Sequence, residues 1–276
     1  MWSLMNNNIT ITNVSEFLNA IPNVDELYHY VGDRRVLFRG QANLSWDLLP
    51  AVYRDDKPKS YINEREYARE IIRRHPEQFK FNNSIDSLIK MQHYSLPTRL
   101  LDWTGNPLVA LYFACEQEKE ADGVVFLEEC SVFKDSEPTV RTIGDFIISG
   151  RGDDDSSLMT IALEYSIHLT SEWLHSKRYV FFSPSLANDR IKAQDGYFAL
   201  YLLFDYKDRH ELEEVESLEK IIVPHDAKAL IRQELMRIGI HKGSLFPELP
   251  NQIKYIEEVV DLNSYQLPED GEGKVL

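Results

Sequence analysis

One stretch of the chain places charged and polar residues between two apolar runs. Residues 92–114 read QHYSLPTRLLDWTGNPLVALYFA, with one apolar run around Leu100 and a second that starts at Leu108. Arginine and aspartate are seldom fully buried unless they are paired. The polar residues of this segment therefore form either an internal ion-pair network or the floor of a binding site. Any fold that buries the segment has to give each of these groups a partner or a ligand.

Three polar side chains of this segment are candidates for chemistry. His93 could serve as a general base or as a hydrogen-bond donor to a ligand, and a structural histidine before a turn is the alternative. Arg99 and Asp102 are three positions apart, so in a strand they face opposite ways. This spacing favours separate partners for the two residues over a simple pair between them.

Arg39 is a candidate for binding an anion. It stands near the end of a short apolar strand predicted over residues 36–40, directly before Gly40. A guanidinium presents a planar fork to a carboxylate or a phosphate, and glycine allows close approach of the backbone. The alternative is a structural arginine paired with an internal acid such as Asp102.

Two further groups of polar residues are weaker candidates. Gln194 lies just before a predicted strand that begins at Gly196, and turn chemistry explains the intervening Asp195 without any function. Three glutamates lie on or near one face of a helix predicted over residues 64–75: Glu64, Glu66 and Glu70. Exposure of that face to solvent explains them without any function.

Composition and charge exclude several classes of protein. The 276 residues carry a net charge of −15, which argues against a broad basic surface for nucleic acid or an anionic membrane. No stretch has the roughly 18 consecutive apolar residues of a membrane span, and the N-terminus lacks a secretory signal. The two cysteines, Cys115 and Cys130, make neither a metal site nor a disulfide framework. We expect a cytoplasmic protein with no metal and no membrane partner.

Apolar patterning predicts strands and helices that alternate without a regular βαβ rhythm. This favours an α+β fold, a mixed β-sheet flanked by helices, in a single domain. The glycines and the acidic run in residues 130–158 predict an exposed loop or lid. The chain has no phosphate-binding loop, dinucleotide fingerprint, zinc-protease motif or serine-hydrolase elbow.

Several blocks of the sequence resemble the FRG domain family, which is named after a Phe-Arg-Gly motif. The blocks are Phe38-Arg39-Gly40-Gln41, the set Trp46, Leu48, Pro50 and Arg54, residues 92–114, residues 193–198 and residues 245–249. The resemblance implies an FRG domain over residues 30–260, a helical lead-in over residues 1–29 and a polar tail over residues 261–276. It also implies a bacterial or phage-borne protein that acts as a toxin or in phage defence.

The order of these blocks is also similar to that of arginine-type ADP-ribosyltransferases. That resemblance implies an ADP-ribosyltransferase-like fold that takes NAD as substrate, with Arg39 on the pyrophosphate. The residues that would bind the cofactor are Arg39, Gly40, Arg99 and Thr104, and the catalytic positions would be Gln194, Asp102 and His93. A glutamine cannot act as a base or carry negative charge. Either another acid, Asp102 or Asp195, supplies that charge, or the chain binds a nucleotide without turning it over.

Two hypotheses follow, and they differ in geometry. An NAD-consuming transferase or glycohydrolase, with a protein or nucleic-acid target, predicts that Arg39, His93, Arg99, Asp102 and Gln194 converge on one pocket. A non-catalytic sensor of a nucleotide or of a partner protein predicts that these residues pair internally and leave no cleft of drug-like size. A nuclease is the least favoured hypothesis, because the negative net charge leaves little basic surface to bind phosphates.

Overall fold

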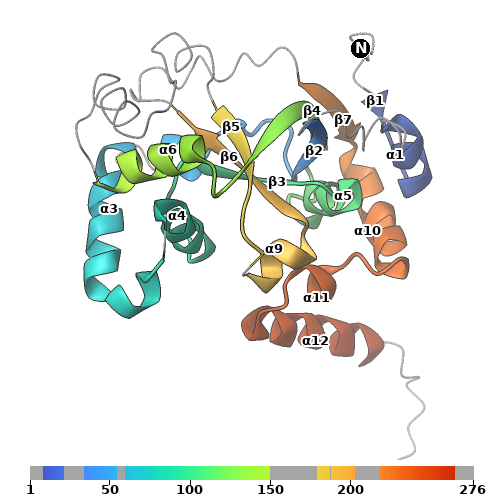
Figure 1. The fold of residues 1–276 in the computed structure, drawn as a ribbon. Helices are drawn as coiled ribbons and strands as arrows, with labels where there is room; N and C mark the ends of the chain where they lie inside the picture. Colours follow the sequence, from blue (N-terminus) through green and yellow to red (C-terminus); the bar gives the residue numbers. More distant parts are fainter. Residues whose placement is uncertain are drawn as a thin grey trace, which may run out of the picture.

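The computed structural model describes residues 9–21, 34–54, 60–81, 83–149, 179–186, 188–202 and 218–264. Its centre is a mixed sheet that closes into a small five-stranded barrel, with helices around it (Figure 1). The strands are β1 (Ile9–Thr10), β2 (Arg34–Gln41), β3 (Leu100–Thr104), β4 (Gly123–Lys134), β5 (Tyr179–Ser183), β6 (Gly196–Tyr201) and β7 (Glu219–Val223). The predicted α+β class, a mixed sheet flanked by helices, is confirmed.

The long strand β4 closes the barrel. The sheet order is β1-β7-β4-β2-β3-β6-β5, and a further pairing joins β5 back to β4. The first half of β4 pairs with β7, antiparallel, and its last residues pair with β5, parallel, with Val132 opposite Phe181. Because β4 also pairs with β2 along most of its length, strands β4, β2, β3, β6 and β5 form a closed ring.

The helices cover the barrel in three groups, as Figure 1 shows. Helices α3, α4 and α6 lie on one side, α1, α5 and α10 on the other, and α9, α11 and α12 below. Their bounds are α1 (Val14–Ala20), α3 (Ser60–Arg74), α4 (Ser84–His93), α5 (Pro107–Glu116), α6 (Pro138–Ser149), α9 (Asp189–Ala193), α10 (Lys228–Arg237), α11 (Lys242–Leu245) and α12 (Leu249–Ser264). Asn106 caps α5 with its side chain, and Pro107 is tolerated at its first position because the proline lacks only an N–H that a helix start leaves unpaired.

Alternation along β2 separates the barrel interior from the α5 side. Leu37 packs with Trp103 and Tyr201 in the cluster that fills the barrel. Phe38 points the other way, into the cluster that contains the apolar residues of α5. Arg39, which follows Phe38, therefore projects on the same side as Leu37, at the end of the barrel.

Two glycines let α5 lie directly on the sheet. A Cβ atom on Gly40 would come within 1.8 Å of the carbonyl oxygen of Ala110, and one on Gly123 within 2.2 Å of that of Ala114. No larger side chain fits at either position without moving the helix. The glycine of the Phe-Arg-Gly motif thus has a packing role that places α5 beside Arg39.

One prediction about the second half of the chain is corrected. Residues 130–149 are not a loop or lid, because β4 extends to Lys134 and α6 spans Pro138–Ser149. Gly144 is a packing position of α6, since a Cβ there would lie 2.8 Å from the side chain of Ile85 in α4. Residues 150–158 lie outside the described residues. Helix α12 continues to Ser264, into the first residues of the predicted polar tail.

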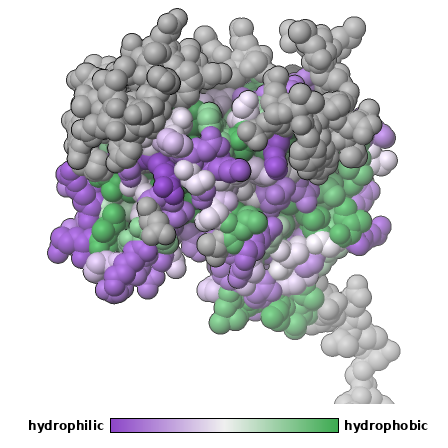
Figure 2. Space-filling view, viewed as in Figure 1, coloured by the Kyte–Doolittle hydropathy of each residue, from purple (hydrophilic) through white to green (hydrophobic). Residues whose placement is uncertain are grey.

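The helices of the described residues include none that is long and apolar enough to cross a membrane. Apolar side chains are nevertheless exposed along α12, at Leu249, Ile253, Ile256 and Val260. Figure 2 shows apolar surface at the lower edge of the molecule, where α12 lies.

Candidate functional site

The main candidate site is a cavity of about 770 Å³ next to the end of β2. One wall comes from β2 and the loop that follows it, a second from the end of α5, and the rest from α9, α11 and α12. The polar and aromatic residues that line it include Arg39, Gln41, Trp46, Asp47, Arg54, Phe113, Glu116, Arg190, Lys242 and Phe246. Four of these are basic and two are acidic, in a chain whose net charge is −15. The cavity is therefore a local concentration of positive charge.

Arg39 is held in this cavity by the backbone. Its Nη1 donates a hydrogen bond to the carbonyl oxygen of Asp102 at 2.5 Å, and its enclosed Nε has no partner among the described residues. Burial lowers the pKa of Arg39 to about 10, while the nearby charge of Asp102 raises it. The guanidinium is thus charged at neutral pH. The bond to a carbonyl leaves that charge available for an anion, and the alternative of an ion pair with the Asp102 carboxylate is not what the structure contains.

Gln41 lies beside Arg39 on the same side of β2. Only 4% of Gln41 is exposed, and its Nε2 donates to the carbonyl oxygen of Trp46 at 3.1 Å. Its Oε1 is enclosed and accepts no hydrogen bond from the described residues. The cavity therefore contains a buried donor and a buried acceptor, on neighbouring side chains, that the protein itself leaves unsatisfied.

Aromatic rings supply flat apolar surface in the same cavity. Trp46 is 44% exposed. Phe113 and Phe246 meet edge to face with ring centroids 6.0 Å apart, and the Arg190 guanidinium lies 4.7 Å from the Phe246 centroid. A planar ligand could stack on these faces, which gives the cavity an apolar component beside its basic one.

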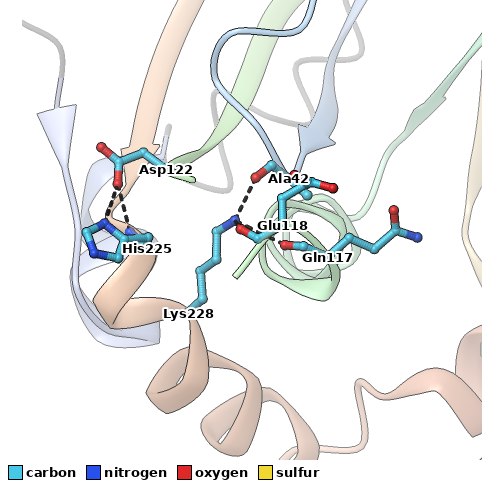
Figure 3. Close-up of polar contacts among 6 residues, drawn as sticks. All are labelled: Ala42, Gln117, Glu118, Asp122, His225 and Lys228. Atoms are coloured by element: carbon cyan, nitrogen blue, oxygen red, sulfur yellow. Dashed lines mark hydrogen bonds and ion pairs between the residues drawn. The ribbon is translucent and has the colours of Figure 1, made fainter. Parts of the chain in front are cut away.

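A buried lysine anchors the wall at the end of α5. The Lys228 Nζ donates to the carbonyl oxygens of Ala42 at 2.6 Å, Glu118 at 2.9 Å and Gln117 at 3.2 Å (Figure 3). Ala42 and Gln117 line the cavity. Burial lowers the pKa of Lys228. Because one ammonium group joins the end of β2 to the C-terminus of α5, it fixes the distance between the two walls.

The residues proposed from the sequence do not all lie in this cavity. Arg39 and Gly40 line it, whereas His93, Asp102 and Gln194 line a separate cavity of about 90 Å³. Arg190 lines both. Neither Arg99 nor Thr104 lines either cavity, so the five residues expected in one pocket do not converge.

Arg99 is the partner of Glu64. Its Nη2 and Nε donate to Glu64 Oε2 at 2.6 and 2.9 Å, and its backbone N–H donates to Oε1 at 3.1 Å. The two side chains are 8% and 5% exposed. The expectation that Glu64 lies on a solvated helix face is wrong, because α3 turns this residue inward. The expectation that Arg99 and Asp102 have separate partners is confirmed.

Thr104 and Gln194 join neighbouring elements. The Thr104 hydroxyl donates to the carbonyl oxygen of Gln194 at 2.6 Å and accepts from the backbone N–H of Asn106 at 3.0 Å. The side chain of Gln194 donates to the carbonyl oxygen of Leu245 at 3.0 Å, which ties α9 to α11. Both side chains thus have partners within the chain.

Asp102 and His93 keep partly free surfaces. Asp102 is exposed and its Oδ1 accepts a hydrogen bond from Gln92 Nε2 at 2.9 Å. His93 Nε2 lies 3.9 Å from Glu248 Oε1, which connects α4 to the segment before α12. The burial of Asp195 raises the pKa of its carboxyl group, while Arg35 acts in the opposite direction. Among the described residues, no group of histidine, cysteine and carboxylate side chains could hold a metal ion.

The cavity contains residues that sequence reasoning did not single out. Glu116 and Lys242 gave no signal in the sequence, since a charged residue at a helix end is ordinary. Trp46 and Arg54 entered only through the family resemblance. What brings them together is the contact of α5 with β2 and the position of α11 below the barrel, which depend on long-range packing.

Comparison with known proteins finds one family model that matches part of the chain. Residues 34–123, from the start of β2 to the start of β4, match the family model of the FRG domain. This range contains the Phe-Arg-Gly motif, the buried ion pair and α5, and so most of two walls of the large cavity. No curated protein and no solved structure matches the chain.

Proposed function

We propose that this FRG domain protein binds a nucleotide of the NAD class in the 770 Å³ cavity, with Arg39 on the pyrophosphate. The observation that carries the proposal is the Arg39 guanidinium, which is charged, enclosed and bonded to a carbonyl oxygen, with Nε unsatisfied. Arg54, Arg190 and Lys242 add positive charge around it. Guanidinium groups match phosphate oxygens in geometry as well as in charge.

The size and lining of the cavity support a nucleotide over a simple anion. Small-molecule sites have volumes of roughly 300–1,000 Å³ and combine apolar surface with a few polar groups. A cavity of 770 Å³ is within this range. Trp46 and the Phe113–Phe246 pair offer stacking surface for a base or a nicotinamide ring. Inorganic phosphate would use only the basic part of this lining.

A second candidate function is the consumption of NAD by ADP-ribosyl transfer or glycohydrolysis, as the resemblance to ADP-ribosyltransferases implies. The observation that favours it is Glu116, whose carboxylate lines the cavity together with Arg39 and accepts a hydrogen bond from the Tyr112 hydroxyl at 3.2 Å. A carboxylate at this place can stabilise the positive charge that develops when the nicotinamide leaves. Gln194 is less suited to that role, because its side chain is bonded to Leu245.

In biological terms, the proposal describes a cytoplasmic toxin or phage-defence effector that acts on a protein or nucleic-acid target. The non-catalytic form of the same proposal is a sensor that changes its partner contacts when a nucleotide binds. Both forms require the nucleotide to occupy the Arg39 cavity. They differ in whether NAD is cleaved.

Ligand-dependent thermal unfolding tests occupancy. A ligand at 100 times its Kd stabilises a protein by about 2.7 kcal/mol, which raises Tm by several degrees. We expect NAD and ADP-ribose to raise Tm of the wild type, and a short RNA to leave it unchanged. The Arg39→Ala variant should lose the shift, while Arg73→Ala, on the exposed face of α3, should keep it. An equal shift in the wild type and in Arg39→Ala would contradict the proposal.

Release of nicotinamide separates the two forms of the proposal. Chromatography of NAD incubated with the wild type and with Glu116→Gln measures it directly. Release by the wild type that the variant loses would support NAD consumption. NAD that raises Tm and stays intact would support the sensor.

A further inference from the structure

We infer that Gln41 accepts a hydrogen bond from a ribose hydroxyl of the bound nucleotide. The cavity then selects ribonucleotides over nucleotides that lack both sugar hydroxyls. The inference rests on the proposed function, because it needs a nucleotide in the Arg39 cavity. It adds a specificity-determining residue and the chemical group that this residue recognises. Its starting point is the free Oε1 of Gln41.

The orientation of the Gln41 amide is fixed by its surroundings. Nε2 donates to the carbonyl oxygen of Trp46, and a flipped amide would place two acceptors against each other. Oε1 is therefore the group left for a ligand, and it can only accept. The ligand has to bring an O–H or N–H donor to it.

The position of Gln41 relates this donor to the phosphates. Gln41 and Arg39 are two residues apart on β2 and project from the same face, so their side chains start about 6.5–7 Å apart. Gly40, between them, faces α5 and presents no side chain. A ligand phosphate on Arg39 thus places the next part of the ligand beside Gln41.

In a 5′-nucleotide, the donors nearest to the phosphates are the 2′ and 3′ hydroxyls, one sugar ring away. The base lies farther along the ligand, where Trp46, in the loop after β2, offers a stacking face. Arg39, Gln41 and Trp46 follow one another along the chain, and Gln41 is bonded to the Trp46 backbone, so this order matches the order phosphate, ribose and base along the ligand. The Arg39 Nε and the Gln41 Oε1, which are buried and unsatisfied, then each gain a partner.

An acceptor built to receive a hydroxyl discriminates strongly against a ligand that lacks it, because the acceptor then stays buried without a partner. We expect 2′,3′-dideoxy-ADP to bind at least about tenfold more weakly than ADP. Pyrophosphate, which has neither sugar nor base, should bind more weakly still.

Calorimetric titration of the full chain with ADP and with 2′,3′-dideoxy-ADP tests the inference. The wild type should show the tenfold preference, and Gln41→Met, which keeps the side-chain length without an acceptor, should lose it. Gln41→Asn withdraws the amide by one methylene and provides a second test if Gln41→Met does not fold. It should lose the preference too.

The inference is overturned if the wild type binds ADP and 2′,3′-dideoxy-ADP equally, or binds neither. It is also overturned if the Gln41 variants keep the preference for ADP. A persistent preference would assign the hydroxyls to another acceptor of the cavity, such as Glu116. The proposed function fails separately, if NAD, ADP-ribose and ADP all fail to bind the wild type.

Discussion

Replacing Glu64 with glutamine should destabilise the protein strongly, although the change is nearly isosteric. Glu64 accepts three hydrogen bonds from Arg99, two from the guanidinium and one from the backbone. The side chains are 5% and 8% exposed, so water cannot replace the lost contacts. Removal of one member of a buried ion pair typically costs about 3–5 kcal/mol. Because glutamine still offers one acceptor oxygen, we expect about 3 kcal/mol for Glu64→Gln.

Urea unfolding, followed by circular dichroism, measures this effect as a lower midpoint at an unchanged slope. The double variant Glu64→Leu/Arg99→Met should lose less stability than the two single variants together, since it leaves no unpaired buried charge. Glu66→Gln on the exposed side of α3 is the matched control and should change stability by less than about 0.5 kcal/mol. A Glu64→Gln variant as stable as this control would refute the buried ion pair and would indicate that Glu64 lies on a solvated face.

Other predictions concern packing, the cavity wall and the thiols. Gly40→Ala should lower the free energy of unfolding by at least about 3 kcal/mol or prevent folding, because its Cβ would overlap the carbonyl of Ala110. Gly239→Ala, at φ 84° with open space around it, should lower it by about 1 kcal/mol. Thermal unfolding compares the two variants. Lys228→Met should cost about 2–4 kcal/mol in urea unfolding, since three carbonyl oxygens lose their donor, and an unchanged midpoint would contradict the anchoring role. Burial raises the pKa of the Cys115 thiol to about 12, so a thiol reagent at pH 8 should not label Cys115 in the folded protein. Rapid labelling of Cys115 in the native protein would contradict its burial.

The sequence predicted those elements whose signals are local. Strand β2, predicted over residues 36–40, and strand β6, predicted to begin at Gly196, agree with the structure. The second half of β4 was missed because it begins with two glutamates, Glu128 and Glu129, and only alternate residues after them, Cys130 and Val132, are buried. Helix α6 was missed because Gly144 looks like a break in the sequence, whereas in the structure it allows close contact with Ile85.

Long-range pairing explains why the site was predicted only in part. Arg39 was identified because it lies near the end of a short apolar strand, directly before a glycine. The structure places it in the large cavity. Arg99 was expected there as well, because its partner Glu64 lies 35 residues away on a helix whose buried face could not be known. Closure of the barrel depends on the parallel pairing of β4 with β5, which no local pattern indicates. Gln41 and Glu116 acquire their significance only from what surrounds them in space.

Calorimetric titration of NAD into the wild type and into Arg39→Ala tests the central claim most directly. We expect micromolar binding to the wild type and at least about a tenfold loss of affinity in the variant, since hydrogen bonds to charged groups contribute about 1.5–3 kcal/mol each. Arg73→Ala, with the same change of charge outside the cavity, should bind as the wild type does. Binding of NAD that is equal in all three proteins, or no binding to the wild type, would contradict the assignment of the Arg39 cavity as a nucleotide site.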